Sequence, residues 1–127
     1  MEVLEAALGY YLSGVIALGI IIIGTRFFVA PHPAAAAFGV PVSPDAHWDA
    51  YLSVKAIRDI VSGLFIAILM IDGSLRLLGW FMLAATIIPF TDAMIVISHG
   101  GTKASAFGIH GATAGVMLII SGVLLLN

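Results

Sequence analysis

Several side chains that can move protons lie within the most apolar parts of the sequence. Asp59 and Asp92 are carboxylic acids, His110 is an imidazole, and Arg58 carries a permanent positive charge next to Asp59. An ionisable group inside a membrane-spanning segment costs free energy and is rarely retained without a partner or a function. This combination indicates a polar pocket that performs general acid–base chemistry.

One helical stripe carries the first part of this pocket. At about 100° per residue, Tyr51, Lys55, Arg58, Asp59 and Ser62 fall within an arc of about 100°. We expect Arg58 to hold a substrate oxygen or a developing negative charge, with Asp59 fixing the geometry of the guanidinium. The remaining three side chains are predicted to bind the substrate.

The other apolar segments add polar residues near one end of each. These are Arg26 in the first segment, Asp92 and His99 in the third, and His110 and Thr113 in the fourth. Because successive segments run in opposite directions, all of them lie on the same side of the membrane. At about 1.5 Å per residue, Asp59, Asp92 and His110 lie roughly 9 to 12 Å inside the boundary.

The predicted substrate is a lipophilic small molecule with a carbonyl, hydroxyl, epoxide or quinone oxygen. Asp92 and His110 are predicted to transfer protons, while Arg26, His99 and Thr113 complete the binding residues. The chemistry would be that of an isomerase, cyclase, hydratase, hydrolase or lyase without a cofactor. No HxxxH or ExxH spacing occurs, so a metal site is not expected.

Three other interpretations stay open. In the first, Arg58 pairs with Asp92 across helices and Lys55 pairs with Asp59 one turn along, which locks the helix register without catalysis. In the second, Asp92 and His110 form a relay in a proton-coupled transporter or channel subunit. In the third, the chain is a structural accessory subunit whose helices dock on partners.

The composition indicates a bilayer as the solvent. Of the 127 residues, 61% are hydrophobic and 9% charged, and the mean hydropathy is +1.16, whereas soluble domains are about a quarter charged. A net charge of −2 leaves no basic surface for nucleic acid. The absence of cysteine excludes thiolate catalysis and iron–sulfur ligation.

Four apolar segments are long enough to cross a bilayer core, which needs about 20 residues per helix. They cover about residues 8–28, 50–71, 75–98 and 104–126. The last three are joined by short breaks, which favour antiparallel neighbours. The sequence therefore predicts a single all-α domain over residues 1–127, an integral membrane antiparallel four-helix bundle.

The first connection is longer and contains four prolines, Pro31, Pro33, Pro41 and Pro44, which forbid a continued helix. Within it, the PAAAAFG segment is expected to form one interfacial turn and His32 to be solvated. In the third segment, Pro89 is expected to kink the helix by leaving a backbone carbonyl without its donor.

Small residues repeat at helical spacing at Gly9, Ser13 and Ala17 in the first segment and at Gly111 and Gly115 in the fourth. Such rows permit close helix contact, either within the bundle or in a homo-oligomer. Packing within the bundle is the expectation that we favour.

Basic residues predict the orientation. Arg26, Lys55 and Lys103 flank the first and third loops, whereas only Arg76 flanks the second. By the positive-inside rule, the first and third loops are cytoplasmic and the termini lie outside. We expect a bacterial inner membrane.

The stretch from Ala37 to Phe65, AFGVPVSPDAHWDAYLSVKAIRDIVSGLF, carries a recognisable pattern. A Phe-Gly pair near the first loop is followed by Ser53, Val54, Lys55, the Arg58–Asp59 pair and Gly63. This resembles the signature of the uncharacterised small four-span membrane family catalogued as domain of unknown function 4267. The resemblance implies a four-helix integral membrane fold and carries no catalytic assignment.

Overall fold

The computed structural model describes residues 1–43 and 47–127, so Pro44 lies outside the described residues. Those residues form helices and connections without a strand. The elements are α1 (Glu2–Val29), α2 (Pro31–Phe38), α3 (Asp49–Asp72), α4 (Leu75–Ala85), α5 (Ile87–Ser98), α6 (Lys103–Ser105), the π-helix η1 (Ala106–Gly111) and α7 (Ala112–Leu126).

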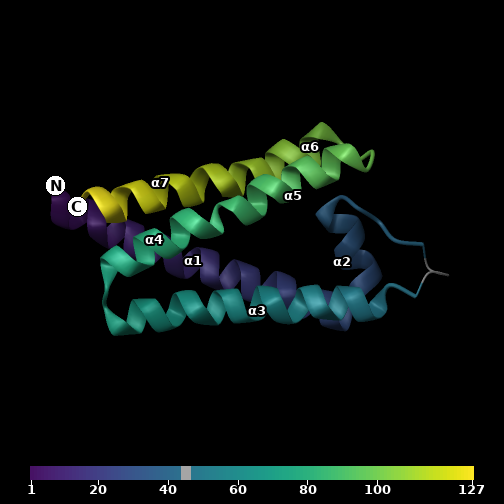
Figure 1. The fold of residues 1–127 in the computed structure, drawn as a ribbon, viewed down its shortest axis with the longest axis horizontal. Helices are drawn as coiled ribbons and strands as arrows, with labels where there is room; N and C mark the ends of the chain where they lie inside the picture. The colour runs from purple at the N-terminus through teal and green to yellow at the C-terminus, as the bar shows by residue number, and fades with distance from the viewer. Residues whose placement is uncertain (44–46) are drawn as a thin grey trace.

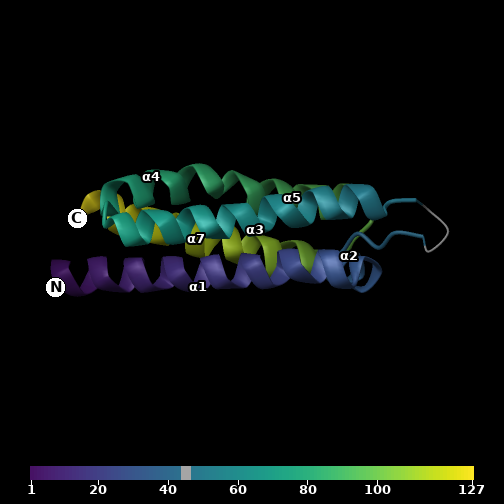
Figure 2. The ribbon, with the colours of Figure 1, turned by 90° about the horizontal axis from the view of Figure 1, so that it is seen from below.

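The helices form an antiparallel bundle made of two pairs. The helix α1 packs along α3, and α4 packs along α7 (Figures 1 and 2). Both termini lie at one end of the bundle, and α2 lies at the other (Figure 1). The expected helical bundle is confirmed.

Three continuous stretches, Glu2–Val29, Leu75–Ser98 and Lys103–Leu126, are long and apolar enough to cross a membrane. The second predicted span, about residues 50–71, corresponds to α3 and is not among these three stretches. This helix has 24 residues but carries Lys55, Arg58 and Asp59 in its first half. These charges set α3 apart from the other three helices.

Glycines let α1 and α3 approach closely. A Cβ atom on Gly63 would lie 2.8 Å from the carbonyl oxygen of Ala17, and one on Gly24 would lie 2.8 Å from that of Ala56. Side chains at these two positions would force the backbones apart. The predicted small-residue row of α1 is buried within the chain, whereas Gly115 of α7 has open space around it.

The third predicted span is interrupted at Thr86, between α4 and α5. Pro89 has no N–H for the carbonyl of Ala85, four residues earlier, so the regular bonding ladder breaks at this point. The Thr86 hydroxyl donates to the carbonyl of Met82 at 2.7 Å. The break is where Pro89 predicts a kink.

Two local structures differ from the prediction. The fourth span begins with the π-helix η1, which widens the turn around His110, instead of a regular α-helix. The predicted single turn in the first connection is the eight-residue helix α2. Pro31 and Pro33 fall in its first turn, where a missing N–H costs nothing, and the following alanines favour helix.

Helix α2 is a cap over one end of the bundle. Its Ala34 and Ala35 are buried together with Phe27 of α1 and Ala56 of α3. His32, which we expected to be solvated, has a side chain that is 35% exposed, with Nε2 lying 3.2 Å from Oδ1 of Asp49 and only Nδ1 buried. This contact ties the start of α2 to the start of α3.

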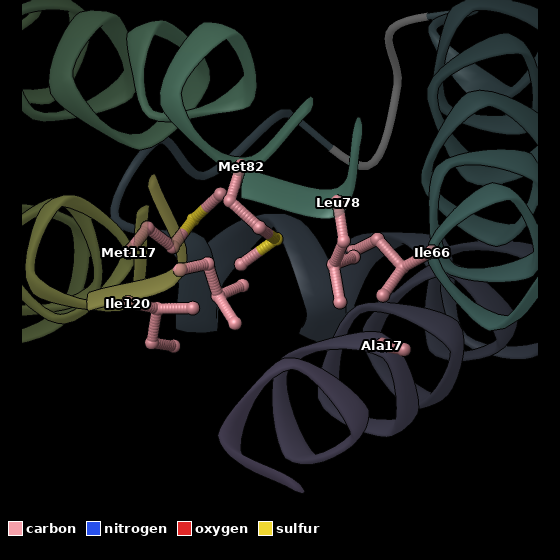
Figure 3. Close-up of a cluster of buried hydrophobic side chains, with 7 residues drawn as sticks. Ala17, Ile66, Leu78, Met82, Met117 and Ile120 are labelled. Carbon is pink, nitrogen blue, oxygen red and sulfur yellow. The ribbon is translucent and has the colours of Figure 1, made fainter. Parts of the chain in front are cut away.

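The main apolar core fills the half of the bundle nearer the termini (Figure 3). Its buried members are Ala17, Ile66, Leu78, Met82, Met117, Ile120 and Leu124. They come from α1, α3, α4 and α7, so all four long helices meet there. Two smaller clusters, around Phe27 and Ala56 and around Val96 and Ala106, lie toward the α2 end.

Candidate functional site

A cavity of about 220 Å³ lies among the helices, between the core and α2. Its polar lining residues are Lys55, Asp59 and Ser62 of α3, Asp92 of α5, His110 of η1 and Thr113 of α7. Apolar side chains such as Val15, Phe81 and Met117 line it toward the core. The polar side chains therefore gather toward the α2 end of the cavity, beside the apolar Ile23, Phe38 and Ile109, and the end toward the core is apolar.

The polar residues of α3 are held in place by an ion pair. Nζ of Lys55 donates to Oδ2 of Asp59 at 2.7 Å. The same ammonium lies 4.5 Å from the centre of the Phe27 ring and 4.9 Å from that of Phe38. These contacts stabilise a charged lysine. Asp59 thus pairs with Lys55 and does not orient Arg58, which corrects our prediction.

Asp92 faces the same cavity without a partner. Within the described residues, its carboxylate forms no hydrogen bond and no ion pair, so the pairing with Arg58 that the first alternative interpretation required is not made. Both carboxylate oxygens of Asp92 remain partly accessible, because neither is a fully buried atom.

His110 is buried and has one side of its ring engaged. Its Nε2 lies 2.7 Å from the carbonyl oxygen of Phe38, and the two rings are 4.2 Å apart. A carbonyl only accepts, so Nε2 carries the hydrogen and donates. In the neutral ring, Nδ1 then has a lone pair, and this atom is accessible too. His110 can therefore accept a proton at Nδ1.

A second cavity of about 170 Å³ adjoins the first under α2. It is lined by Arg26 and Phe27 of α1 and by Ala34 and Ala37 of α2. Ile23, Phe38, Ile109 and His110 line both cavities. Phe38 and His110, which are hydrogen-bonded and have their rings tilted by 50°, thus lie where the two spaces meet.

Three predicted site residues lie elsewhere. Arg58 is exposed, lines neither cavity, and donates from Nη1 to the carbonyl of Val54 at 3.1 Å. It stands at the edge of the predicted arc, about 100° from Asp59 around the helix. Tyr51 is 69% exposed. His99 is exposed, with Nδ1 2.9 Å from the carbonyl of Ile95.

Phe38 is the residue that the sequence analysis did not select. It contacts Lys55 and His110 and borders both cavities. Its signal in the sequence was the Phe-Gly pair at Phe38 and Gly39, where Gly39 ends α2 with a φ of 109°. The Phe38 ring reaches the site only because α2 lies across the end of the bundle.

Within the part of the chain that the structure describes, no three His, Asp or Glu side chains cluster as metal ligands. The polar groups of the cavity are instead one carboxylate without a partner, one imidazole, two hydroxyls and one ion pair. Such a set can bind a hydroxyl or carbonyl group and move protons.

Comparison with known proteins identifies the family. Residues 17–124 match the family described as Domain of unknown function (DUF4267), a range that includes every residue of the larger cavity except Val15 and Ile16. No curated protein and no solved structure is detectably similar to the chain. The protein therefore belongs to the DUF4267 family.

Proposed function

We propose that the protein binds a ring-sized lipophilic molecule that carries a hydroxyl or carbonyl group. The observation that supports this proposal best is the accessible, unpaired carboxylate of Asp92 in a cavity whose far end is apolar. A bare carboxylate in such surroundings is costly unless a ligand or water supplies its hydrogen bonds.

The size of the cavity limits the ligand. An apolar cavity of about 150 Å³ holds benzene, so 220 Å³ accommodates one ring with a polar substituent. The apolar end would take the ring, and the polar end would take the oxygen. Asp92 and Nδ1 of His110 accept hydrogen bonds, while Lys55 donates, and a hydroxyl group satisfies both kinds of partner.

The same groups support acid–base chemistry on that ligand. Asp92 and His110 would exchange protons with the substrate, and the Lys55 ammonium would stabilise negative charge on its oxygen. Lys55 thereby takes the role predicted for Arg58, because Arg58 does not line the cavity. The proposed reaction classes are isomerisation, cyclisation and hydration.

A proton-coupled transporter or channel subunit is less well supported. A relay through Asp92 and His110 would have to continue through the half of the bundle that the apolar core fills (Figure 3). A purely structural accessory subunit would not need an unpaired carboxylate. The closed core therefore favours binding or catalysis.

The proposed setting is a bacterial inner membrane with the first and third loops in the cytoplasm. This orientation is supported by the basic residues Arg26, Lys55 and Lys103 at that end. A homo-oligomer, if formed, would use the open glycine face of α7 around Gly115.

Two matched probes test the proposal. We expect 4-ethylphenol to raise the thermal unfolding temperature of the detergent-solubilised protein more than ethylbenzene, because only the phenol meets Asp92. The Asp92→Asn variant should lose this preference, because the neutral amide is a weaker hydrogen-bond acceptor for the phenol than the two oxygens of the carboxylate. Thr91→Val, an exposed neighbour on α5, is the control and should behave like the wild type.

Native mass spectrometry of the protein released from nanodiscs gives a second readout. A small molecule that co-purifies with the wild type should be absent from the Asp92→Asn protein and present in Thr91→Val. Equal stabilisation by both probes in the wild type, or an unchanged preference in Asp92→Asn, would contradict the proposal.

A further inference from the structure

Arg58 belongs to the family signature but not to the proposed binding cavity. Its side chain is exposed on the outward side of α3, and its Nη1 donates to the carbonyl of Val54. The adjacent carboxylate of Asp59 is 13% exposed and is bound by Lys55. Within residues 1–43 and 47–127, no carboxylate pairs with Arg58.

The outward-facing surface beside Arg58 is mainly apolar, with Lys55 and Ser62 one turn away on its cavity side. One and two turns away along α3 lie Tyr51, Val54, Val61 and Phe65, which are 69%, 46%, 52% and 46% exposed. In a membrane, lipid contacts such a face. A guanidinium does not give up its proton, so its charge at this position requires an anion or water.

The position of Arg58 places its charge within reach of lipid headgroups. It follows Asp49, the first residue of α3, by nine residues, or about 13 Å along the axis. Its side chain turns back toward the start of the helix, as the bond to Val54 shows. The Trp48 and Tyr51 rings, 5.7 Å apart, lie at that start, and such aromatic pairs mark the headgroup level.

We propose that Arg58 binds the phosphate of an anionic phospholipid in the leaflet at the α2 end of the bundle. The unused N–H groups of the guanidinium match two phosphate oxygens. The acyl chains would lie along Val54, Val61 and Phe65. An anionic headgroup is favoured because the cation of a choline headgroup competes for the same phosphate. This site is separate from the cavity and does not depend on the proposed ligand.

Lipid retention tests the site. The wild type, Arg58→Gln and Arg76→Gln are purified in detergent, mixed with equal amounts of phosphatidylglycerol and phosphatidylcholine, and compared by native mass spectrometry. Arg76 is the second residue of α4, at the opposite end and exposed, so this variant matches the loss of charge. Circular dichroism checks that each variant keeps its helices.

The wild type and Arg76→Gln should retain one phosphatidylglycerol. Arg58→Gln should bind it roughly tenfold more weakly, which corresponds to one charge-assisted hydrogen bond. The proposal is overturned by equal retention in wild type and Arg58→Gln, by equal loss in both variants, or by equal binding of the two lipids. A dimer of the wild type that Arg58→Gln abolishes would also overturn it, in favour of an acidic protein partner.

Discussion

The charged residues of the cavity differ in whether they form an ion pair. Lys55 and Asp59 neutralise each other, and the rings of Phe27 and Phe38 hold the ammonium from two further helices. Asp92 has no such partner in the described chain. In the proposed function, Asp92 is accordingly the carboxylate that meets the ligand, and Asp59 holds the Lys55 ammonium in place.

This division predicts the energetics of the pair. Lys55→Met leaves the Asp59 carboxylate without its partner in weakly polar surroundings, and Asp59→Asn removes the counter-charge of the ammonium. Each change should lower the free energy of unfolding in detergent. In the Lys55→Met/Asp59→Asn protein, the loss of unfolding free energy should be about 1 to 3 kcal/mol smaller than the sum of the two single losses, because no unpaired charge is then left. Strictly additive losses would show that the pair contributes nothing.

At the scale of elements, the contact between α1 and α3 depends on glycine. A Cβ atom at position 63 would lie 2.5 Å from Cγ1 of Ile21 and 2.8 Å from a backbone oxygen of the facing helix. The Ile21 side chain can change its rotamer, whereas the Ala17 backbone oxygen can move only if the whole helix α1 shifts. The close contact also fixes the rotation of α3, which turns Lys55 and Asp59 inward.

Gly63→Ala should therefore separate the two helices. We expect the variant to lose about 1 to 3 kcal/mol of unfolding free energy, as overpacked cores do. Gly115→Ala is the control, because a Cβ atom there meets nothing within 4 Å. That change should be neutral or stabilise by up to about 1 kcal/mol, since alanine favours helix. Chemical unfolding in one detergent measures both, and equal effects would contradict the assigned contact.

As a whole molecule, the protein has its main apolar core toward the termini and two cavities, together with two smaller apolar clusters, toward α2. The core of α1, α3, α4 and α7 supplies rigidity near the termini, while α2 and η1 close the other end through the bond between Phe38 and His110. The break at Thr86 and the wide turn of η1 both border the cavity. Irregular helical geometry is thus concentrated where the bundle leaves space.

A larger side chain in the larger cavity should stabilise the protein and prevent ligand binding. Ala85 lines the larger cavity, whereas Ala84 beside it is exposed. Ala85→Leu should raise the unfolding temperature, by the equivalent of about 0.5 to 2 kcal/mol, and abolish the preference for the phenol probe. Ala84→Leu should change neither quantity by much. If Ala85→Leu still bound the probe, the ligand would have to occupy another space.

The sequence by itself determined that the chain is a helical membrane bundle and at which end its polar residues lie. Both follow from local properties. An apolar run of sufficient length must form a helix in lipid, and successive spans must cross the membrane in opposite directions, which brings alternate segment ends to the same side. It also located the break near Pro89, whose missing N–H acts within one turn.

Only the tertiary structure decided which polar side chains face inward. The rotation of α3 separates Lys55 and Asp59 from Arg58. In this rotation, α3 meets α1 at two glycines, where Gly24 lies against Ala56 and Asp59 and Gly63 lies against Ala17. The place of Phe38 depends on a bond to His110, 72 residues further along the chain. Contacts between such distant residues arise only when all the helices pack, which is why the sequence predicted several of the polar residues at one end of the bundle but not the side chains that surround them.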